Sequence, residues 1–317
     1  MNRRIVWNAG VDWNGQLVSS AKVRVTASDG TTPAPPPGMV YIPAGVFQMG
    51  DNFNEIGPDT LPVHNVHVDA LFMDKFEVSY QLFVDVMSWG QARGYQTGGS
   101  SKGVGFPIHN VGWYAAVMWC NARSEKENLT PCYYTDAART AVYRSGLVDF
   151  TNDRVKWDAN GYRLPTEAEW EKAARGGLFG KRYPWGDTID GSMANFFRSG
   201  DTFETQPFPQ TTPVGYYNGN QTPVGVNMAN GYGLYDIAGN VWEHCWDWYS
   251  GTSYGLEEAT TNPHGPTTGT FRVLRGGGWA YVSSWARCAA RFYLTPGSNL
   301  YFSESFGHEG FRCVRKP

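Results

Sequence analysis

The chain has 317 residues, of which 15% are aromatic and only 17% are charged, and its formal net charge is −3 at pH 7. This slightly acidic balance excludes the strong basic field typical of nucleic-acid-binding proteins, and no apolar run reaches the roughly 20 residues of a membrane-spanning helix. We therefore expect no nucleic-acid partner, no membrane insertion, and many loops that are held in place by aromatic side chains.

The first 38 residues predict a strand segment followed by a Pro-rich linker. Residues 23–27 alternate as a strand does, and residues 28–38 read SDGTTPAPPPG. Residues 1–38 are therefore interpreted as an appended strand pair or the tail of a preceding domain, and residues 39–317 as a second domain. No apolar h-region follows the first arginines, so the chain as given shows no signal peptide. If it is a fragment of a longer secreted protein, an extracytoplasmic or cell-surface location is favoured.

Short strands and then three helices are predicted ahead of a long irregular half. Strands flank a turn at residues 43–45, and Ser79 caps a helix over residues 80–89. A second helix spans residues 113–126. The third begins after Thr166, where Glu169 completes a capping box and Gly176 supplies the stop. From residue 178 onward the pattern predicts aromatic turns and short strands.

Residues 231–249, GYGLYDIAGNVWEHCWDWY, predict a loop that is buried by its own aromatic side chains. A buried irregular loop leaves carbonyl groups without partners, and a hard cation gathers such oxygens together. Asp236 and Glu243 would supply the charge, with the carbonyl groups of Gly239 and Val241 between them. In the alternative interpretation, Asp236 caps a turn and Glu243 pairs with an arginine. The spacing alone leaves both interpretations open.

Eight ordered motifs resemble the formylglycine-generating enzyme (sulfatase-modifying factor) family. They are YIPAGVFQMGD, NVGWYAAVMWCN, RLPTEAEWEKAARGG, YPWGD, NGYGLYDIAGNVWE, RVLRGGGW, RCAAR and GFRCVR, between residues 41 and 315. The resemblance implies an α+β class and a loop-rich, C-type lectin-like fold with few helices, short antiparallel strands and structural Ca²⁺.

Family features carry over to individual positions of this chain. The resemblance implies one calcium site at Asp236, Gly239, Val241 and Glu243, and a second that begins at Asn195 and Phe196. At the second site the matching downstream position is Gln206 where the family has an aspartate. A family disulfide maps onto Cys120 and Cys313, and Cys245 is the partner suggested for Cys288.

The resemblance stops at the family's catalytic segment. The family enzymes carry two cysteines there, which bind copper and activate dioxygen, and thiolates are the ligands that copper(I) selects. Residues 279–286, WAYVSSWA, contain no cysteine, and the six histidines do not form the cluster that related iron enzymes need. We therefore expect no formylglycine reaction. An oxidoreductase of this family that acts on a protein or small-molecule substrate remains the alternative.

The segments that replace the catalytic one predict a ligand-binding surface within residues 275–313. Residues 280–285 and 292–309 are rich in Tyr, Phe, Ser and Asn, as antibody binding loops are. They also resemble the variable regions of diversity-generating retroelement variable proteins, although an accessory binding domain or ordinary core loops fit too. The ligand would be a protein or a small molecule. The expected contacts are Ala280, Tyr281, Val282, Ser283, Ser284, Trp285, Phe292, Tyr293, Leu294, Ser298, Asn299, Tyr301 and Phe302.

Overall fold

The computed structural model describes residues 33–148, 150–252, 254, 261–297 and 308–317. The contacts between residues divide the chain into two units, Met1–Pro33 and Ala34–Pro317. All helices and strands of the described part belong to the second unit. The strand predicted at residues 23–27 lies outside the described residues, and the domain boundary near residue 38 stays a prediction.

Two small sheets follow the linker, with strands on both sides of the predicted turn. β1 (Met39–Ile42) pairs antiparallel with β4 (Leu71–Asp74), which also pairs with β9 (Val314–Arg315) from the end of the chain. β2 (Gly45–Met49) and β3 (His64–Val68) form a separate antiparallel pair. Because β9 lies beside β4, the last residues of the chain are fixed next to its first strands.

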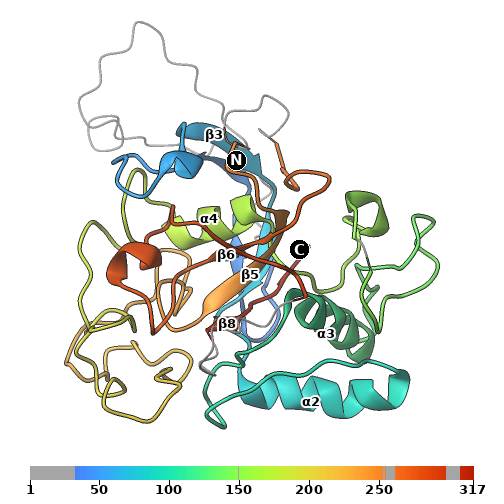
Figure 1. Cartoon of the computed structure of the whole chain (residues 1–317), viewed down its shortest axis with the longest axis horizontal. Helices are drawn as coiled ribbons and strands as arrows, with labels where there is room; N and C mark the ends of the chain where they lie inside the picture. The colour runs from blue at the N-terminus through green and yellow to red at the C-terminus, as the bar shows by residue number, and fades with distance from the viewer. Residues whose placement is uncertain (1–32, 149, 253, 255–260, 298–307) are drawn as a thin grey trace, which may run out of the picture. The chain divides into compact units, whose positions relative to one another are not determined.

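The three predicted helices are confirmed, with the predicted caps. Ser79 caps α2 (Tyr80–Gly90), and α3 (Trp113–Lys126) packs against it (Figure 1). At α4 (Glu167–Arg175) the capping box between Thr166 and Glu169 is complete, and Gly176 ends the helix in the left-handed region, with φ 57°. None of the helices in the described part is long and apolar enough to cross a membrane.

A four-stranded sheet lies beside α4 and carries the irregular half of the chain. Its strand order is β7 (Phe292–Leu294), β6 (Arg272–Arg275), β5 (Trp242–Trp248) and β8 (Glu309–Gly310). β5 and β8 are parallel, and the other pairs are antiparallel. In Figure 1, α4 lies next to β5 and β6. Four 3₁₀ turns complete the described elements: Pro58–Thr60, Gln91–Arg93, Asn152–Arg154 and Ser283–Ala286.

The stretch at residues 231–249 is buried as predicted, but its second half is the strand β5 and not a loop. All seven residues of β5 are buried, which is typical of a strand covered on both faces. Arg272 is also buried, and its guanidinium lies between the rings of Trp113 and Trp248, 3.8 and 3.5 Å from their centroids. The rings and the carbonyl of Trp246, which accepts from Arg272, offset the cost of burying this charge.

Candidate functional site

Aromatic rings from distant segments meet in one continuous row. Most come from the turn at residues 279–286 and from β7, and one comes from a loop about 70 residues earlier in the chain. Successive centroids are 5.3 Å apart for Phe208 and Trp279, 5.1 Å for Trp279 and His308, 5.5 Å for His308 and Tyr281, and 5.9 Å for both Tyr281–Phe292 and Phe292–Tyr293. These spacings are those of interacting rings. We call Phe197, Phe208, Trp279, Tyr281, Val282, Trp285, Phe292 and Tyr293 the aromatic surface.

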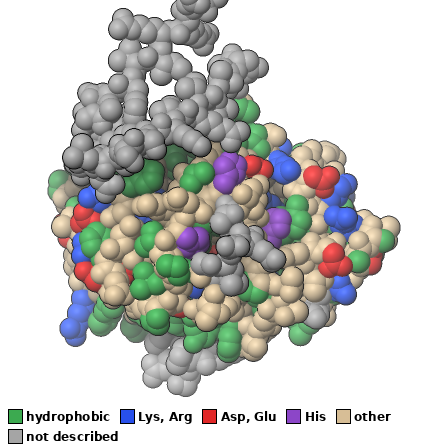
Figure 2. Space-filling model, turned by 90° about the horizontal axis from the view of Figure 1, so that it is seen from above, with side chains coloured by type: hydrophobic (Ala, Val, Ile, Leu, Met, Phe, Trp, Pro, Cys, Tyr) green, Lys and Arg blue, Asp and Glu red, His purple; other side chains and the backbone are tan. Residues whose placement is uncertain are grey.

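Several members of the aromatic surface are open to solvent. The exposed fraction is 44% for Phe197, 55% for Phe208, 50% for Val282 and 42% for Tyr293. Phe197 joins the surface because its N–H donates to the carbonyl of Tyr281 at 2.9 Å. Neighbouring apolar groups left exposed together are typical of an interaction site. The face drawn in Figure 2 carries hydrophobic and His side chains near its middle, and many of its acidic and basic side chains lie toward the two sides.

The floor of the aromatic surface is built from buried and half-buried rings. Trp242 on β5 is fully buried, and its ring centroid is 5.1 Å from Phe292, 5.3 Å from Tyr281 and 5.9 Å from Trp285. Burial lowers the pKa of His308 to about 4, so this imidazole is neutral at pH 7. Burial, together with the nearby Glu309, raises the pKa of Tyr281 above its ordinary value. Neither ring therefore contributes charge near neutral pH.

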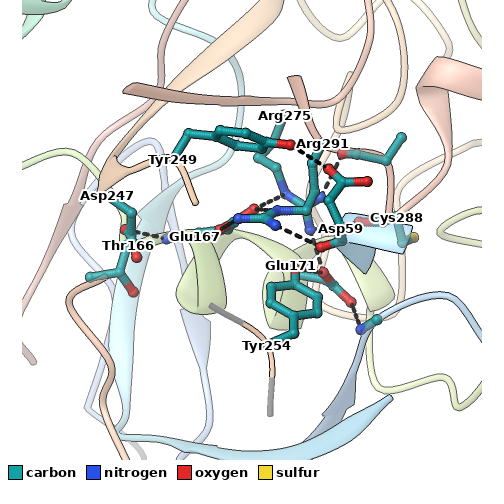
Figure 3. A network of polar contacts seen from close by, with 12 residues as sticks. Asp59, Thr166, Glu167, Glu171, Asp247, Tyr249, Tyr254, Arg275, Cys288 and Arg291 are labelled. Carbon is teal, nitrogen blue, oxygen red and sulfur yellow. Dashed lines mark hydrogen bonds and ion pairs between the residues drawn. The ribbon is translucent and has the colours of Figure 1, made fainter. Parts of the chain in front are cut away.

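Beneath β7 lies a buried network of arginines and carboxylates, drawn in Figure 3. Arg291, the residue before β7, donates to both oxygens of Glu167 at 2.7 and 2.9 Å and to the carbonyl of Asp59 at 2.6 Å. Tyr249 donates to the Asp59 carboxylate at 2.9 Å and stacks on Tyr293, with centroids 4.2 Å apart. These contacts fix the start of β7 to α4, so the surface strand is held from below.

A second half of this network joins α4 to β6. Glu171 accepts from Arg175 at 2.7 Å and also pairs with Arg275, and all three residues are buried. The carbonyl of Cys288 accepts from Arg275 at 3.0 Å, which fixes the chain between the 279–286 turn and β7. Paired in this way, the buried charges satisfy one another; removal of one partner would leave an uncompensated charge.

The predicted calcium loop shows both contacts of the alternative interpretation. Glu243 accepts from Arg312 at 2.7 Å on each oxygen, and Asp236 accepts from the N–H of Gly215 at 2.5 Å. A third carboxylate, Glu77, accepts from the side chain of Asn240 at 2.6 Å and from the N–H of Val241 at 3.1 Å. No sequence motif connects Glu77 with this loop, because it lies 163 residues from Asn240.

The charges of this loop do not balance. Three carboxylates lie near one guanidinium, that of Arg312: Glu77 and Glu243 are buried, and Asp236 is half-buried. The pKa of Glu77 is raised well above its ordinary value, first by burial and then by the negative charges of Asp236 and Glu243. Burial also raises the pKa of Asp236 to about 6, and its Oδ1 has no partner within the described part of the chain. An orphaned, buried carboxylate oxygen fits a cation ligand. No group of three or more His, Cys, Asp or Glu side chains in the described ranges is arranged as a complete metal site.

The second predicted metal segment lies directly against the first. The carbonyl of Asn195 accepts from the N–H of Asn240 at 2.8 Å, and a Cβ on Gly239 would lie 2.2 Å from the same carbonyl oxygen. Gly239 is therefore required by this close approach. The side chain of Asn195 donates to the carbonyl of Gln210 at 2.8 Å, whereas Gln206 is exposed. Phe196 is buried next to it.

All five cysteines are buried thiols in the structure. The sulfur atoms of Cys120 and Cys313 lie 3.5 Å apart without a bond, so the structure brings the predicted pair together but does not show the disulfide. Cys245 and Cys288 both belong to the core around α4, as free thiols. Burial raises the pKa of Cys245 and raises that of Cys288 to about 12, so neither is a thiolate near neutral pH.

The structure brings together many of the predicted ligand contacts. Tyr281, Trp285, Phe292 and Tyr293 belong to one cluster of rings. Ser284 is exposed, and Ala280, Ser283 and Leu294 are half-buried beside these rings. The remaining four, Ser298, Asn299, Tyr301 and Phe302, lie outside the described residues. Phe197 and Phe208 were missed, because no sequence pattern connects them with residues 279–293.

Comparison with known proteins identifies the family. The model of the sulfatase-modifying factor enzyme 1-like domain matches residues 25–317. The chain belongs to this family. The formylglycine-generating enzyme of Thermomonospora curvata is 35% identical over 308 residues, with 88% of this chain and 94% of that enzyme covered. That of Streptomyces coelicolor is 36% identical over 299 residues, with 87% and 88% covered.

Solved structures of the sulfatase-modifying factor family type share the fold. Treponema denticola variable protein 1 matches with a TM-score of 0.64 at 29% identity, covering 88% of this chain and 95% of that one. The structure of CarF matches with a TM-score of 0.63 at 28% identity, covering 89% and 99%. The predicted α+β, C-type lectin-like fold of the formylglycine-generating enzyme type is thus confirmed.

Proposed function

We propose that this protein is a non-catalytic ligand-binding member of the sulfatase-modifying factor family, and that its aromatic surface is the binding site. The aromatic surface itself carries this proposal. It combines exposed rings with a buried aromatic floor and a backbone that is fixed from below, and aromatic contacts of this kind dominate binding energetics in interfaces. The ligand contacts would be made first by the four exposed members, Phe208, Val282, Phe197 and Tyr293.

The chain's thiols favour binding over oxidation chemistry. Residues 279–286 hold no cysteine, and each of the five cysteines is at most 1% exposed. A substrate at the aromatic surface would therefore not reach a thiolate of this chain. The similarity to Treponema denticola variable protein 1 supports a display role, as in diversity-generating retroelement variable proteins. The alternative is an oxidoreductase of the formylglycine-generating enzyme family, the activity for which the curated relatives at 35–36% identity are named.

The Ca²⁺ expected from the family would be held by Asp236 and Glu243, with the carbonyl groups of Gly239 and Val241, and a second ion by Asn195 and the carbonyl of Phe196. The orphaned Asp236 oxygen supports the first assignment. When bound, the ion would offset the excess negative charge of the acidic loop. Because β5 begins inside this loop with Trp242, an ion that orders the loop would also fix the position of Trp242 at the floor of the aromatic surface.

One experiment separates the two functions. Copper and calcium are quantified in the purified protein, and oxygen uptake is followed with a cysteine-containing peptide as substrate. A binding protein is expected to consume no oxygen with or without added copper. The variant Val282→Ser, at an exposed side chain with no ring contact, should fold normally and lose affinity for a hydrophobic probe such as N-phenyl-1-naphthylamine. Stoichiometric copper with thiol-dependent oxygen uptake would contradict the proposal and establish the oxidoreductase.

A further inference from the structure

One exposed cation lies at the edge of the aromatic surface. Arg198 follows Phe197, and its guanidinium carbon is 5.1 Å from the centroid of that ring. The N–H of Phe197 is bonded to the carbonyl of Tyr281, so Arg198 is fixed within one residue of the surface. Arg198 has φ 61°, in the left-handed region that only a few per cent of residues other than glycine adopt. The tight turn thus sets where this side chain leaves the backbone.

The charge of Arg198 is not neutralised in place. Among the described residues it has no ion-pair partner within 4.0 Å, whereas Arg287 near the other end of the turn pairs with Glu55 at 2.8 Å. The two nearest acids in sequence are engaged elsewhere. Asp201 is buried and accepts from the N–H of Phe203 at 2.7 Å, and Glu204 accepts from the N–H of Gly200 at 3.1 Å.

Among the described residues, the rest of the aromatic surface adds no second exposed charge. His308 is neutral at pH 7 because burial lowers its pKa to about 4. Glu309 is fully buried, and its carboxylate accepts from the N–H of His308 at 3.0 Å, so it does not reach solvent. The exposed part of the aromatic surface is therefore apolar with a positive edge. Arginine beside aromatic residues is the composition found at the centres of protein interfaces.

We propose that the ligand of the aromatic surface is a protein segment in which an acidic side chain lies next to an apolar or aromatic one, with the acid paired to Arg198. This rests on the proposed function, and it adds the class of partner. A protein fits better than a small molecule, because sites for small ligands enclose most of the ligand surface, whereas these side chains are 42–55% exposed and stand out from the protein. The apolar side chain would lie over Val282 and the rings, and the carboxylate would accept from the guanidinium.

Two fluorescent probes with the same ring system test the chemistry. 8-Anilinonaphthalene-1-sulfonate carries an anion, and N-phenyl-1-naphthylamine is its neutral counterpart. We expect Arg198→Gln to weaken sulfonate binding about fivefold, as for a partly exposed ion pair, and to leave the neutral probe unchanged. The loss should disappear near 1 M salt, where the charges are screened. Glu204→Gln should strengthen sulfonate binding, because it removes a nearby negative charge.

The chain offers a matched control. Arg93 is also exposed and lies over an aromatic ring, that of Trp89 at 4.1 Å, but it belongs to the 3₁₀ turn that follows α2. Arg93→Gln should change neither titration. Val282→Ser should weaken both probes, which shows that they bind at this surface. If Val282→Ser has no effect, the aromatic surface is not the binding site and the proposed function fails. If it weakens both probes while Arg198→Gln changes neither, only the inference about Arg198 is wrong.

A peptide library tests the partner directly. Random dodecapeptides displayed on phage are selected on the immobilised protein, and the clones are screened against Arg198→Gln. We expect the clones that lose binding to this variant to be enriched in Asp or Glu next to Trp, Phe, Tyr or Leu. Enrichment of Lys and Arg, or clones indifferent to Arg198, would overturn the proposal.

Discussion

Asp247 offers a sharp test of the buried network beneath the aromatic surface. It is buried on β5 and accepts from the N–H of Glu167 at 2.7 Å. Burial, and then the charge of Glu167, raises its pKa from 3.8 to about 8. The folded protein therefore retains a proton that the unfolded chain has already released. Stability from this group is complete below about pH 4 and is lost as the pH rises toward about 8.

The size of the effect follows from the pKa shift. Each pH unit inside this window costs about 1.4 kcal/mol, so the wild-type protein should lose about 3 to 4 kcal/mol between pH 5 and pH 8 through Asp247. The substitution Asp247→Asn keeps an oxygen to accept from Glu167 and removes the ionisation. For a domain of this size, the variant should gain roughly 8 °C in melting temperature over the wild type between these two pH values.

The assay is calorimetric unfolding of both proteins at pH 5 and pH 8. Asp153→Asn is the control. Asp153 is exposed, and its pKa is lowered by the hydroxyl of Thr151, so it titrates below this window. The melting-temperature difference between Asp153→Asn and the wild type should therefore be the same at pH 5 and pH 8. If the difference between Asp247→Asn and the wild type is the same at both pH values, the carboxyl is not held protonated, and the account of the network is wrong.

Three further predictions concern the caps, the metal and the thiols. Thr166→Ala removes the capping box of α4 and should cost about 1 kcal/mol, or roughly 2–4 °C by calorimetry, whereas the exposed Thr202→Ala should cost nothing measurable. Calcium at 100 times its dissociation constant should raise the free energy of unfolding of the wild type by about 2.7 kcal/mol. Asp236→Asn should abolish this gain in stability. An equal gain in the variant would show that Asp236 is not a calcium ligand. Non-reducing mass spectrometry of an oxidised sample should show a peptide joined through Cys120 and Cys313. The free energy of unfolding should be about 2 to 5 kcal/mol higher in the oxidised protein than in the reduced one. A mass that shows only free thiols after oxidation would count against the disulfide.

The sequence predicted the helices correctly, because their ends are fixed by interactions between residues close in sequence. The caps at Ser79 and Thr166 and the stop at Gly176 lie within a few residues of the helix ends that they fix. The strand β5 was misjudged because the stretch at 231–249 contains glycines, and these occur only in its first half. Burial between α4 and the neighbouring strands then makes the second half extended.

The candidate site was predictable only where its residues are close in sequence. Tyr281, Trp285 and Phe292 share one tract of unusual composition, so that tract alone indicated a surface. Phe208 and Glu77 lie about 70 and 160 residues from their partners Trp279 and Asn240. Their chemistry is ordinary for a core or a surface position, and only the fold brings them to the site.

The separation between network and surface explains how this scaffold could tolerate variation at its binding site. Arg291 holds the start of β7 through its own guanidinium, and Arg275 holds the preceding turn through the carbonyl of Cys288. Neither interaction involves the side chains of Tyr293 or Val282. A change at the exposed Val282 should therefore alter what is bound while the free energy of unfolding changes by less than about 0.5 kcal/mol. A change at Tyr293 should cost about 0.5 to 1.5 kcal/mol more, because it also removes the stack on Tyr249.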